Sequence, residues 1–315
     1  MLSFTRGKEI GKFTEGKMKG KYIRLYGEND FGDLGKPDII INKEDSSDLL
    51  DNDFYKEQNI TPAKKRQFNQ ILNGKLKLDD KDMSELLKEQ LEEAKKQIEE
   101  TLKKRILFDD PSTKIFPVPQ KESERIYVPA PSGSGKSTFI GEYLNFIREK
   151  YGKKRKIYIF SRVDEDKPLD KHKNVIRIPL EEDWFKTKPL NIDDFKDGIL
   201  IFDDIDTIMN KSVVRYVRNF RDDVLETGRH YNMTVISTSH LIANFLATRT
   251  LINEANAIVL FPRGSSFSAI SNFLDRYMGF TKKQIRYVEK LPTRWIWFWK
   301  EYPKYAIHEK GAFIY

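Results

Sequence analysis

The stretch that decides the fold is Ala130–Thr138, which reads APSGSGKST. It matches the phosphate-loop pattern G-x-x-x-x-G-K-[ST] at every position except the first, where Ala130 stands in place of the glycine. The apolar run RIYV precedes it, as in a strand, and TFIGEYLNFIREKY follows it with the spacing of an amphipathic helix. Strand, glycine-rich turn and helix are the context in which such a loop binds phosphate. We expect Ala130 to lie at the strand end, where its methyl group need not face the phosphates.

The residue types within this loop suit the binding of ATP and Mg²⁺. Gly133 and Gly135 allow the backbone conformations that a cradle of N–H groups around the β- and γ-phosphates requires. Lys136 can reach the β- and γ-phosphate oxygens, the Ser137 hydroxyl is a candidate ligand of Mg²⁺, and the N-terminus of the next helix adds its dipole. The predicted nucleotide-binding residues are Ser132, Gly133, Ser134, Gly135, Lys136, Ser137 and Thr138.

A second motif, GILIFDDID at residues 198–206, supplies two adjacent carboxylates at the end of an apolar strand. In open α/β sheets, ligands bind at the edge where the parallel strands end. We predict that Asp203 holds Mg²⁺ and that Asp204 is the base for an attacking water. Asp206 is expected to cap the next helix. A second carboxylate beside the magnesium ligand favours water as the acceptor, and hence an ATPase over a small-molecule kinase.

A third motif, ETGRHYNMTVISTSH, places polar residues at the end of another strand. We predict that His240 senses the γ-phosphate or the attacking water; the alternative is that the STSH turn only caps a helix. Arg229 precedes the strand and is our candidate for an arginine finger that completes a neighbouring subunit's site, with Arg263 as the other contender. The predicted catalytic residues are Lys136, Asp204, His240 and Arg229.

Short apolar runs alternate with helical patterns after residue 123, which predicts an α/β fold. Strands are predicted at 125–130, 156–162, 175–179, 198–204, 233–239, 257–262, 294–300 and 305–309. Helices are predicted at 136–151, 208–227, 242–254, 265–277 and 281–289. Near-continuous apolar strands separated by helices indicate a mostly parallel sheet flanked by helices, of the P-loop NTPase (RecA/FtsK-like) type, with the last two strands as an antiparallel extension. Trp295, Trp297 and Trp299 alternate with apolar residues, which favours a buried strand over a base-stacking surface.

Three prolines between residues 111 and 119 predict a boundary between a charged N-terminal region, residues 1–112, and an ATPase domain, residues 113–315. Residues 1–110 contain 22 basic and 23 acidic residues, which leaves 34 and 25 for the rest of the chain, a net charge of +9 there. The basic stretch from Arg6 to Arg24 is equally compatible with a hairpin and with an extended arm. A helix is predicted at about 81–106, and its narrow apolar stripe favours packing on the core over a coiled-coil seam.

Composition excludes several classes of function. The 315 residues include no cysteine, which rules out disulfides, thiolate zinc sites and cysteine nucleophiles, and the four histidines are too dispersed to form a metal cluster. No apolar run approaches the roughly 20 residues that span a bilayer, and the N-terminus lacks the apolar segment of a secretory signal. We therefore expect a soluble protein made inside a cell. The net charge of +8 favours an acidic partner, nucleic acid before anionic membrane.

The motifs VPAPSGSGKST, ILIFDD and GRHYNMTVISTSH, in this order, resemble those of the viral genome-packaging ATPases of the FtsK–HerA superfamily, in the poxvirus-type branch of large DNA viruses. The terminal aromatic strands near WFWKEYPKYAIHEKG are also similar, and the resemblance covers residues 113–315. It implies a homo-oligomeric ring, pentameric or hexameric, that moves double-stranded DNA into a capsid in the host cell cytoplasm or acts within the virion. Capsid or viral membrane components are implied as further partners. Members of the family often carry Gln where His240 stands.

Two alternatives from other classes stay open. A nucleotide-kinase-type phosphotransferase can share PSGSGKST, but it needs an arginine-rich lid over a monophosphate acceptor, and the segment after the loop helix shows no clear lid. A nucleotide-gated assembly protein, which is not an enzyme, would use the basic N-terminal arm and the long helix to dock a shell or a membrane.

Overall fold

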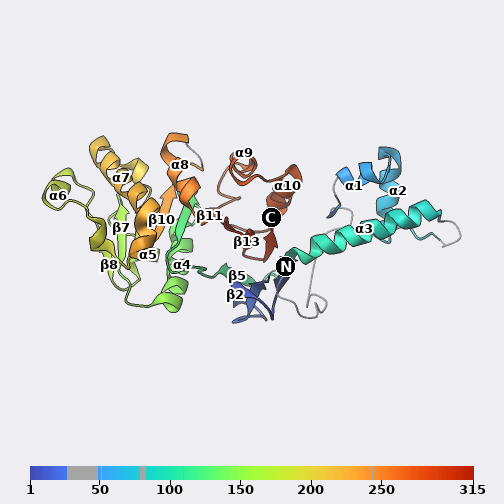
Figure 1. Cartoon of the computed structure of the whole chain (residues 1–315), viewed down its shortest axis with the longest axis horizontal. Coiled ribbons are helices and arrows are strands. Elements are labelled where there is room, and N and C mark those ends of the chain that lie inside the picture. The colour runs from blue at the N-terminus through green and yellow to red at the C-terminus, as the bar shows by residue number, and fades with distance from the viewer. Residues whose placement is uncertain (27–48, 51, 79–82, 109, 243–244) are drawn as a thin grey trace.

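The computed structural model describes residues 1–26, 49, 50, 52–78, 83–108, 110–242 and 245–315. Its centre is a ten-stranded sheet (Figure 1). The parallel part consists, in spatial order, of β11 (Ala257–Leu260), β6 (Arg125–Pro129), β10 (Thr234–Ser239), β9 (Ile199–Asp203), β7 (Ile157–Ser161) and β8 (Val175–Arg177). Beyond β11 follow the antiparallel strands β12 (Ile296–Trp299), β13 (Tyr305–His308), β14 (Gly311–Ile314) and β4 (Arg105–Leu107). The predicted fold class is confirmed, although the extension contains two strands, β14 and β4, that the sequence patterns did not predict.

Both faces of this sheet are apolar, which explains why its strands appear as continuous apolar runs. In β9, Leu200 and Phe202 face one core, whereas Ile199 and Ile201 face the other. The first face is covered by α7 (Lys211–Thr227), α8 (Phe245–Glu254), α9 (Phe267–Met278) and α10 (Lys282–Lys290), and the second by α4 (Lys136–Tyr151). Figure 1 shows α7 to α10 above the sheet and α4 below it. The sheet edge that carries the loop motifs is therefore held from both sides.

The connections of the parallel part contain short helical turns. These are α5 (Lys167–Asp170), α6 (Glu182–Thr187), and the 3-10 helices η2 (Ile192–Phe195), η3 (Ile205–Thr207) and η4 (Gly228–Tyr231). The five long helices predicted after residue 123 are present with ends shifted by a few residues, and residues 243 and 244 of the predicted helix 242–254 lie outside the described residues.

The tryptophans of the C-terminal extension belong to the core, as predicted. Trp295, Trp297 and Trp299 are at most 6% exposed and face α4 on one side of the sheet. The ring centroids of Tyr143 and Trp297 are 4.7 Å apart, and those of Phe139 and Trp295 are 4.9 Å apart. Since Phe139 lies in the first turn of α4, this aromatic packing fixes the helix that begins at the phosphate loop.

The N-terminal residues form a second, four-stranded antiparallel sheet. Its strands, in order, are β1 (Leu2–Ser3), β3 (Tyr22–Leu25), β2 (Lys8–Glu15) and β5 (Lys114–Pro117). Of the two interpretations of the basic stretch, the hairpin is therefore correct, since β2 and β3 pair antiparallel. Its apolar residues, such as Ile10 and Phe13, join the same core as α4. The division of the chain at residue 112 stays a prediction; in the structure, β4 lies in the large sheet and β5 in the small one.

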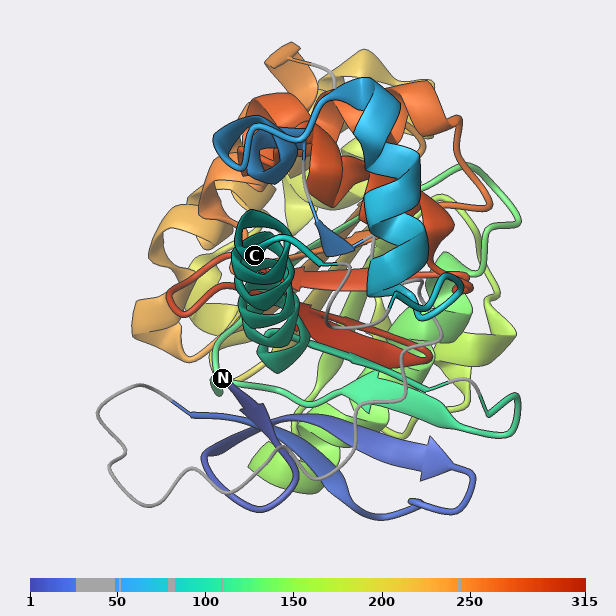
Figure 2. The ribbon, with the colours of Figure 1, turned by 90° about the vertical axis from the view of Figure 1, so that its right-hand side faces the viewer.

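Three helices form what we call the helical lobe: α1 (Asn52–Glu57), α2 (Pro62–Leu72) and α3 (Glu85–Lys103). Figures 1 and 2 show it at one end of the long axis, with α2 and α3 side by side. The predicted helix 81–106 is shorter than expected, since 105 and 106 belong to β4, and residues 81 and 82 lie outside the described part. Its stripe packs on α1 and α2 in a separate small core, through Leu91, Ala94 and Ile98, and not on the main core. Among the helices described, none is both long and apolar enough to cross a membrane.

Candidate functional site

The phosphate loop is anchored where it leaves the sheet. Ala130 is fully buried in the core at the end of β6, as expected, and its N–H donates to the Ser239 carbonyl oxygen at 2.9 Å. Gly133 and Gly135 have φ angles of 76° and 97°, which favour glycine. A Cβ atom at Gly133 would meet no atom within 4 Å. The loop therefore needs glycine there for its backbone conformation and not for space.

Lys136 folds back under its own loop. The side chain is 8% exposed, and its Nζ donates to the Ala130 carbonyl oxygen at 2.8 Å. The same atom forms an ion pair with Asp204 Oδ2 at 3.1 Å. The hydroxyl-bearing residues of the loop differ in exposure: Ser132 and Thr138 are exposed, whereas Ser134 and Ser137 are half-buried. The lysine that the motif assigns to phosphate is thus already linked to a carboxylate from another strand.

The topology brings the three sequence motifs to one edge of the sheet. Strand β10 lies between β6 and β9 and runs parallel to both. Its residue Ser239 is opposite Pro129 of β6, and Ser237 is opposite Phe202 of β9. The carboxyl ends of these strands therefore meet at one place, although the motifs are far apart in the sequence.

Thr238 connects the two carboxylates. Its hydroxyl lies 2.9 Å from Asp203 Oδ1 and 2.9 Å from Asp204 Oδ1, and it accepts the Asp204 N–H at 2.8 Å. Ser161, at the end of β7, donates to Asp203 Oδ2 at 2.9 Å. Sequence reasoning placed Thr238 among the polar residues of its strand end and missed Ser161, whose only signal is a hydroxyl directly after an apolar strand.

The two aspartates have different environments. Burial raises the pKa of Asp203 above its usual value, and the neighbouring Asp204 charge raises it further, while the hydrogen bonds from Ser161 and Thr238 oppose the shift. Asp204 has a φ of 44°, in the left-handed region that a residue with a Cβ seldom occupies. Residues held in such sparsely populated backbone conformations cluster at active sites and ligand clamps.

His240 completes the cluster. Its Nε2 lies 3.3 Å from Asp204 Oδ2, so the carboxylate lies between His240 and Lys136. Four of the predicted residues, Lys136, Asp203, Asp204 and His240, are thus brought together. His240 is 39% exposed, so its ring is accessible from solvent.

Arg229 lies elsewhere. It belongs to η4, which precedes β10, so it is at the opposite edge of the sheet from His240, where it is exposed beside His230. Any catalytic contact of Arg229 would have to be made in another chain's site. Arg263 follows β11 and is exposed on the loop next to the phosphate loop; a Cβ at the adjacent Gly264 would lie 2.4 Å from Ser134 Oγ.

One local prediction was wrong. Asp206 does not cap the following helix, because the chain first forms η3 and α7 begins later, at Lys211. The cap is Asn210, whose side chain accepts the N–H groups of Ser212 and Val213. Asp206 instead forms an ion pair with Arg218 at 2.7 Å.

The donor set fits Mg²⁺ only together with a nucleotide. In the described part of the chain, no group of three or more acidic or histidine side chains is placed to hold a metal alone. Ser137, in the first turn of α4, and the half-buried Asp203 offer a hydroxyl and a carboxylate. Mg²⁺ commonly takes one or two such protein oxygens, with phosphate oxygens and waters as its other ligands.

Comparisons with known proteins give partial likenesses in structure. No family model matches the chain. The genome packaging NTPase B204 from Sulfolobus turreted icosahedral virus 2, in complex with AMPPCP, has a TM-score of 0.41 and 13% identity over 60% of this chain and 98% of that chain. EccC of Thermomonospora curvata (ATPases 2 and 3) has a TM-score of 0.36 and 12% identity over 59% of this chain and 43% of that chain. Similarity at this level does not by itself assign an activity.

One curated protein is related to this chain by sequence. The uncharacterized protein V3 of the Sputnik virophage is 38% identical over 205 residues, which cover 64% of this chain and 82% of that protein. At this identity and coverage, the chain belongs to the same family as the Sputnik virophage protein V3.

Proposed function

We propose that the protein hydrolyses ATP with Mg²⁺ at this sheet edge. The observation that carries the proposal is the position of the Asp204 carboxylate, within 3.3 Å of both Lys136 Nζ and His240 Nε2 and beside the half-buried Asp203. A phosphate loop, a magnesium-type carboxylate and a second carboxylate for water are the parts that phosphoryl transfer to water requires.

Each residue has a defined part in the proposed reaction. The loop N–H groups and Lys136 bind the β- and γ-phosphates, and Lys136 exchanges its bond with the Ala130 carbonyl for one to phosphate oxygen. Ser137 and Asp203 would hold Mg²⁺, which when bound neutralises charge on the phosphates. Asp204, released from Lys136, orients the attacking water and accepts its proton. His240 contacts the γ-phosphate or this water, and the Thr238 hydroxyl connects the two carboxylates and orients them.

We further propose that ATP hydrolysis drives the movement of double-stranded DNA. The protein would act as a homo-oligomeric ring of five or six subunits that packages a viral genome into a capsid. Support comes from the resemblance of three ordered motifs to viral packaging ATPases, from the relation to a virophage protein, and from the net charge of +9 after residue 110. In such a ring, Arg229 would act in the neighbouring subunit's site. We also propose that the protein acts in the host cell cytoplasm or in the virion. Capsid or membrane components are the proposed partners of residues 1–112.

The decisive experiment measures ATP turnover with and without duplex DNA, together with the particle mass in solution. We expect turnover that needs Mg²⁺, rises with DNA, and is lost in Lys136→Ala and Asp204→Asn. A matched control is Lys171→Ala, since Lys171 is an exposed lysine outside the three motifs. Turnover that is indifferent to DNA would overturn the motor, and turnover that survives Lys136→Ala would overturn the assigned site.

A further inference from the structure

The helical lobe carries a strongly basic segment that the ATPase site does not use. Residues 61–78 contain five basic residues and no acidic residue. They are Lys64, Lys65, Arg66, Lys75 and Lys77. The solvent face of α3, by contrast, alternates Glu and Lys, as in Glu92, Glu93, Lys95 and Lys96. The positive charge of the lobe is therefore concentrated between Lys64 and Lys77, before the aspartates at positions 79, 80 and 82.

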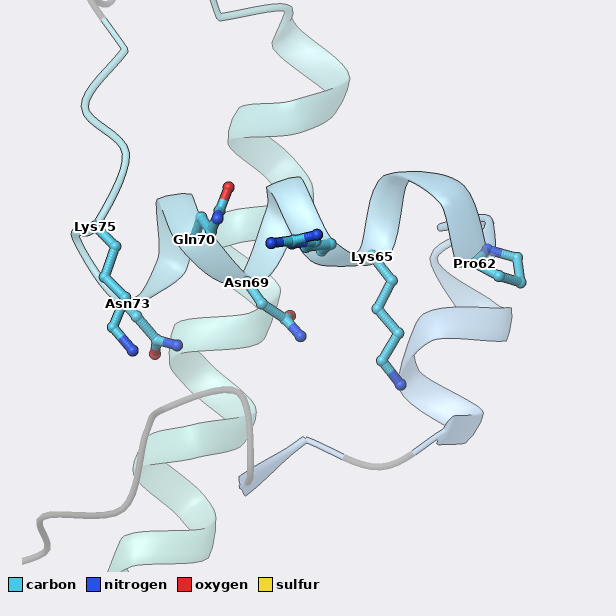
Figure 3. Close-up of a pocket in the computed structure, with 7 residues that line it drawn as sticks. Pro62, Lys65, Asn69, Gln70, Asn73 and Lys75 are labelled. Atoms are coloured by element: carbon cyan, nitrogen blue, oxygen red, sulfur yellow. The ribbon is translucent and has the colours of Figure 1, made fainter.

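A groove of about 520 Å³ runs along the basic face of α2. Its lining includes three cations, Lys65, Arg66 and Lys75, and three amides, Asn69, Gln70 and Asn73. Lys65, Asn69 and Asn73 follow one another at a spacing of four residues, which places them in one row on the helix. Figure 3 shows Lys65, Asn69, Asn73 and Lys75 directed to the same side of the helix.

Contacts with α1 hold part of this row in place. The Lys65 ammonium lies 3.9 Å from the centre of the Tyr55 ring, a cation–π contact. The Tyr55 hydroxyl donates to Asn69 Oδ1 at 2.9 Å, so the amide of Asn69 has a defined orientation. Tyr55 itself is buried in the small core of the lobe. The row is thus presented by a packed surface and not by a flexible tail.

The chemistry of the groove favours a nucleic-acid backbone over an anionic membrane. Arg, Lys, Asn and Gln side chains are the usual partners of phosphate and sugar oxygens in protein–DNA contacts. The lining holds no aromatic or large aliphatic side chain that could insert into a bilayer. Helix α2 is about 16 Å long at 1.5 Å per residue, and duplex DNA carries about ten phosphate charges over that length.

We infer that the groove along α2 is a binding site for the phosphate backbone of duplex DNA, independent of nucleotide and of base sequence. The choice of duplex DNA rests on the proposed function, whereas binding in the groove does not need hydrolysis. The lobe is linked to the large sheet, because α3 leads into β4 and Lys283 of α10 donates to the Leu49 carbonyl oxygen at 2.9 Å. DNA held by the lobe is therefore held by the body that contains the ATPase site.

The test compares two triple variants of the full chain by fluorescence anisotropy with a labelled duplex at several KCl concentrations, without ATP. The first is Lys65→Gln, Arg66→Gln, Lys75→Gln, in the groove. The second, Lys88→Gln, Lys95→Gln, Lys96→Gln, removes the same charge from α3 of the same lobe. We expect the groove variant to bind at least about tenfold more weakly, with a salt slope smaller by about 2 to 3, since each lost phosphate contact removes about 0.9.

The outcomes separate this inference from the proposed function. If the groove variant and the α3 variant bind equally, with equal salt slopes, the inference fails while the motor can stand. If the wild-type chain binds no duplex, both fail. If the groove variant loses binding to phosphatidylserine vesicles but keeps its DNA affinity, the groove is a membrane site and the inference is overturned. Unchanged ATP turnover without DNA, in both triple variants, shows that each is folded.

Discussion

The Nε2 atom of His240 lies 3.3 Å from Oδ2 of Asp204, across the ends of two adjacent parallel strands. The same carboxylate oxygen is 3.1 Å from Lys136 Nζ. One carboxylate therefore connects the residue assigned to phosphate with the residue assigned to sensing. Movement of Lys136 toward a phosphate would leave His240 as the remaining cationic or N–H partner of Asp204.

This relationship predicts the behaviour of His240 variants. His240→Ala removes a donor beside the proposed base, so we expect the rate of ATP turnover to fall by about a hundredfold, as when one positioned donor is lost. His240→Gln keeps an N–H group near Asp204 and should retain most of the activity. Steady-state turnover measures both, with His230→Ala as the control, because His230 is exposed at the opposite edge. Equal losses in the Ala and Gln variants would contradict the proposed contact.

Thr238→Ala should change the pH dependence of the rate. The Thr238 hydroxyl lowers the pKa of Asp203, so its loss raises that pKa, and the acidic limb of the rate profile should move to higher pH. The neighbouring Ser237→Ala is a matched control: among the described residues, its buried hydroxyl has no hydrogen-bond partner. A pH–rate profile of the two variants checks this. If both profiles coincide with the wild type, Thr238 does not tune the carboxylates.

Gly133→Ala tests the loop conformation itself. Gly133 has a φ of 76°, and Gly20 in the hairpin turn has a φ of 86°, and a Cβ at either position would meet no atom within 4 Å. Both substitutions should therefore cost about 1 kcal/mol of stability or slightly more, from backbone strain alone. Only Gly133→Ala should also weaken nucleotide binding, measured by the ATP-dependent rise in melting temperature. A similar loss of binding in Gly20→Ala would show that the effect is global.

Mixing experiments should identify the arginine finger. If Arg229 serves a neighbouring site, Arg229→Ala and Asp204→Asn subunits are each inactive alone, and mixed rings regain turnover, because some interfaces then contain both intact residues. Arg263→Ala, whose arginine lies on the loop beside its own phosphate loop, should not be rescued by Asp204→Asn subunits if it acts within its own subunit. Absence of any rescue with Arg229→Ala would leave that residue without a catalytic part.

The sequence predicted those parts of the candidate site that lie within a single local motif. The phosphate loop, the strand end at Asp203 and the strand end at His240 are each recognisable from neighbouring residues. Their meeting depends on β10 lying between β6 and β9, a long-range pairing that no local pattern contains. The same limit explains the missed Ser161, which becomes relevant only because β7 pairs with β9.

The parts of the fold that escaped prediction are short or weakly patterned. Strand β4 has three residues and follows directly on α3, so its helical neighbours obscure it. The N-cap residue of helix α2, Thr61, makes no capping hydrogen bond with its side chain, and the helix buries only Phe68. Its stability comes from packing on α1 and α3, which only the tertiary structure shows.

The stability of the protein should depend on pH through the buried Glu124. Glu124 is 1% exposed, and burial raises its pKa to about 6, although the Tyr143 hydroxyl and the Gln120 N–H bond to the carboxylate. Between about pH 4.5 and 6, the folded chain therefore binds more protons at Glu124 than the unfolded chain does. This contribution to the free energy of unfolding is present below pH 4.5 and is lost as the pH rises, by about 2 kcal/mol at 1.36 kcal/mol per pKa unit.

Glu124→Gln removes this titration, so the difference in unfolding free energy between wild type and variant should shift by about 2 kcal/mol in favour of the variant from pH 4.5 to 7. Tyr143→Phe removes a hydrogen bond to the carboxylate, which raises the Glu124 pKa further and should steepen the loss. Urea unfolding at a series of pH values measures both. The difference in unfolding free energy between wild type and Glu124→Gln could instead stay constant across this range. That result would mean that water hydrates the Glu124 carboxylate and that the group titrates near its ordinary pKa.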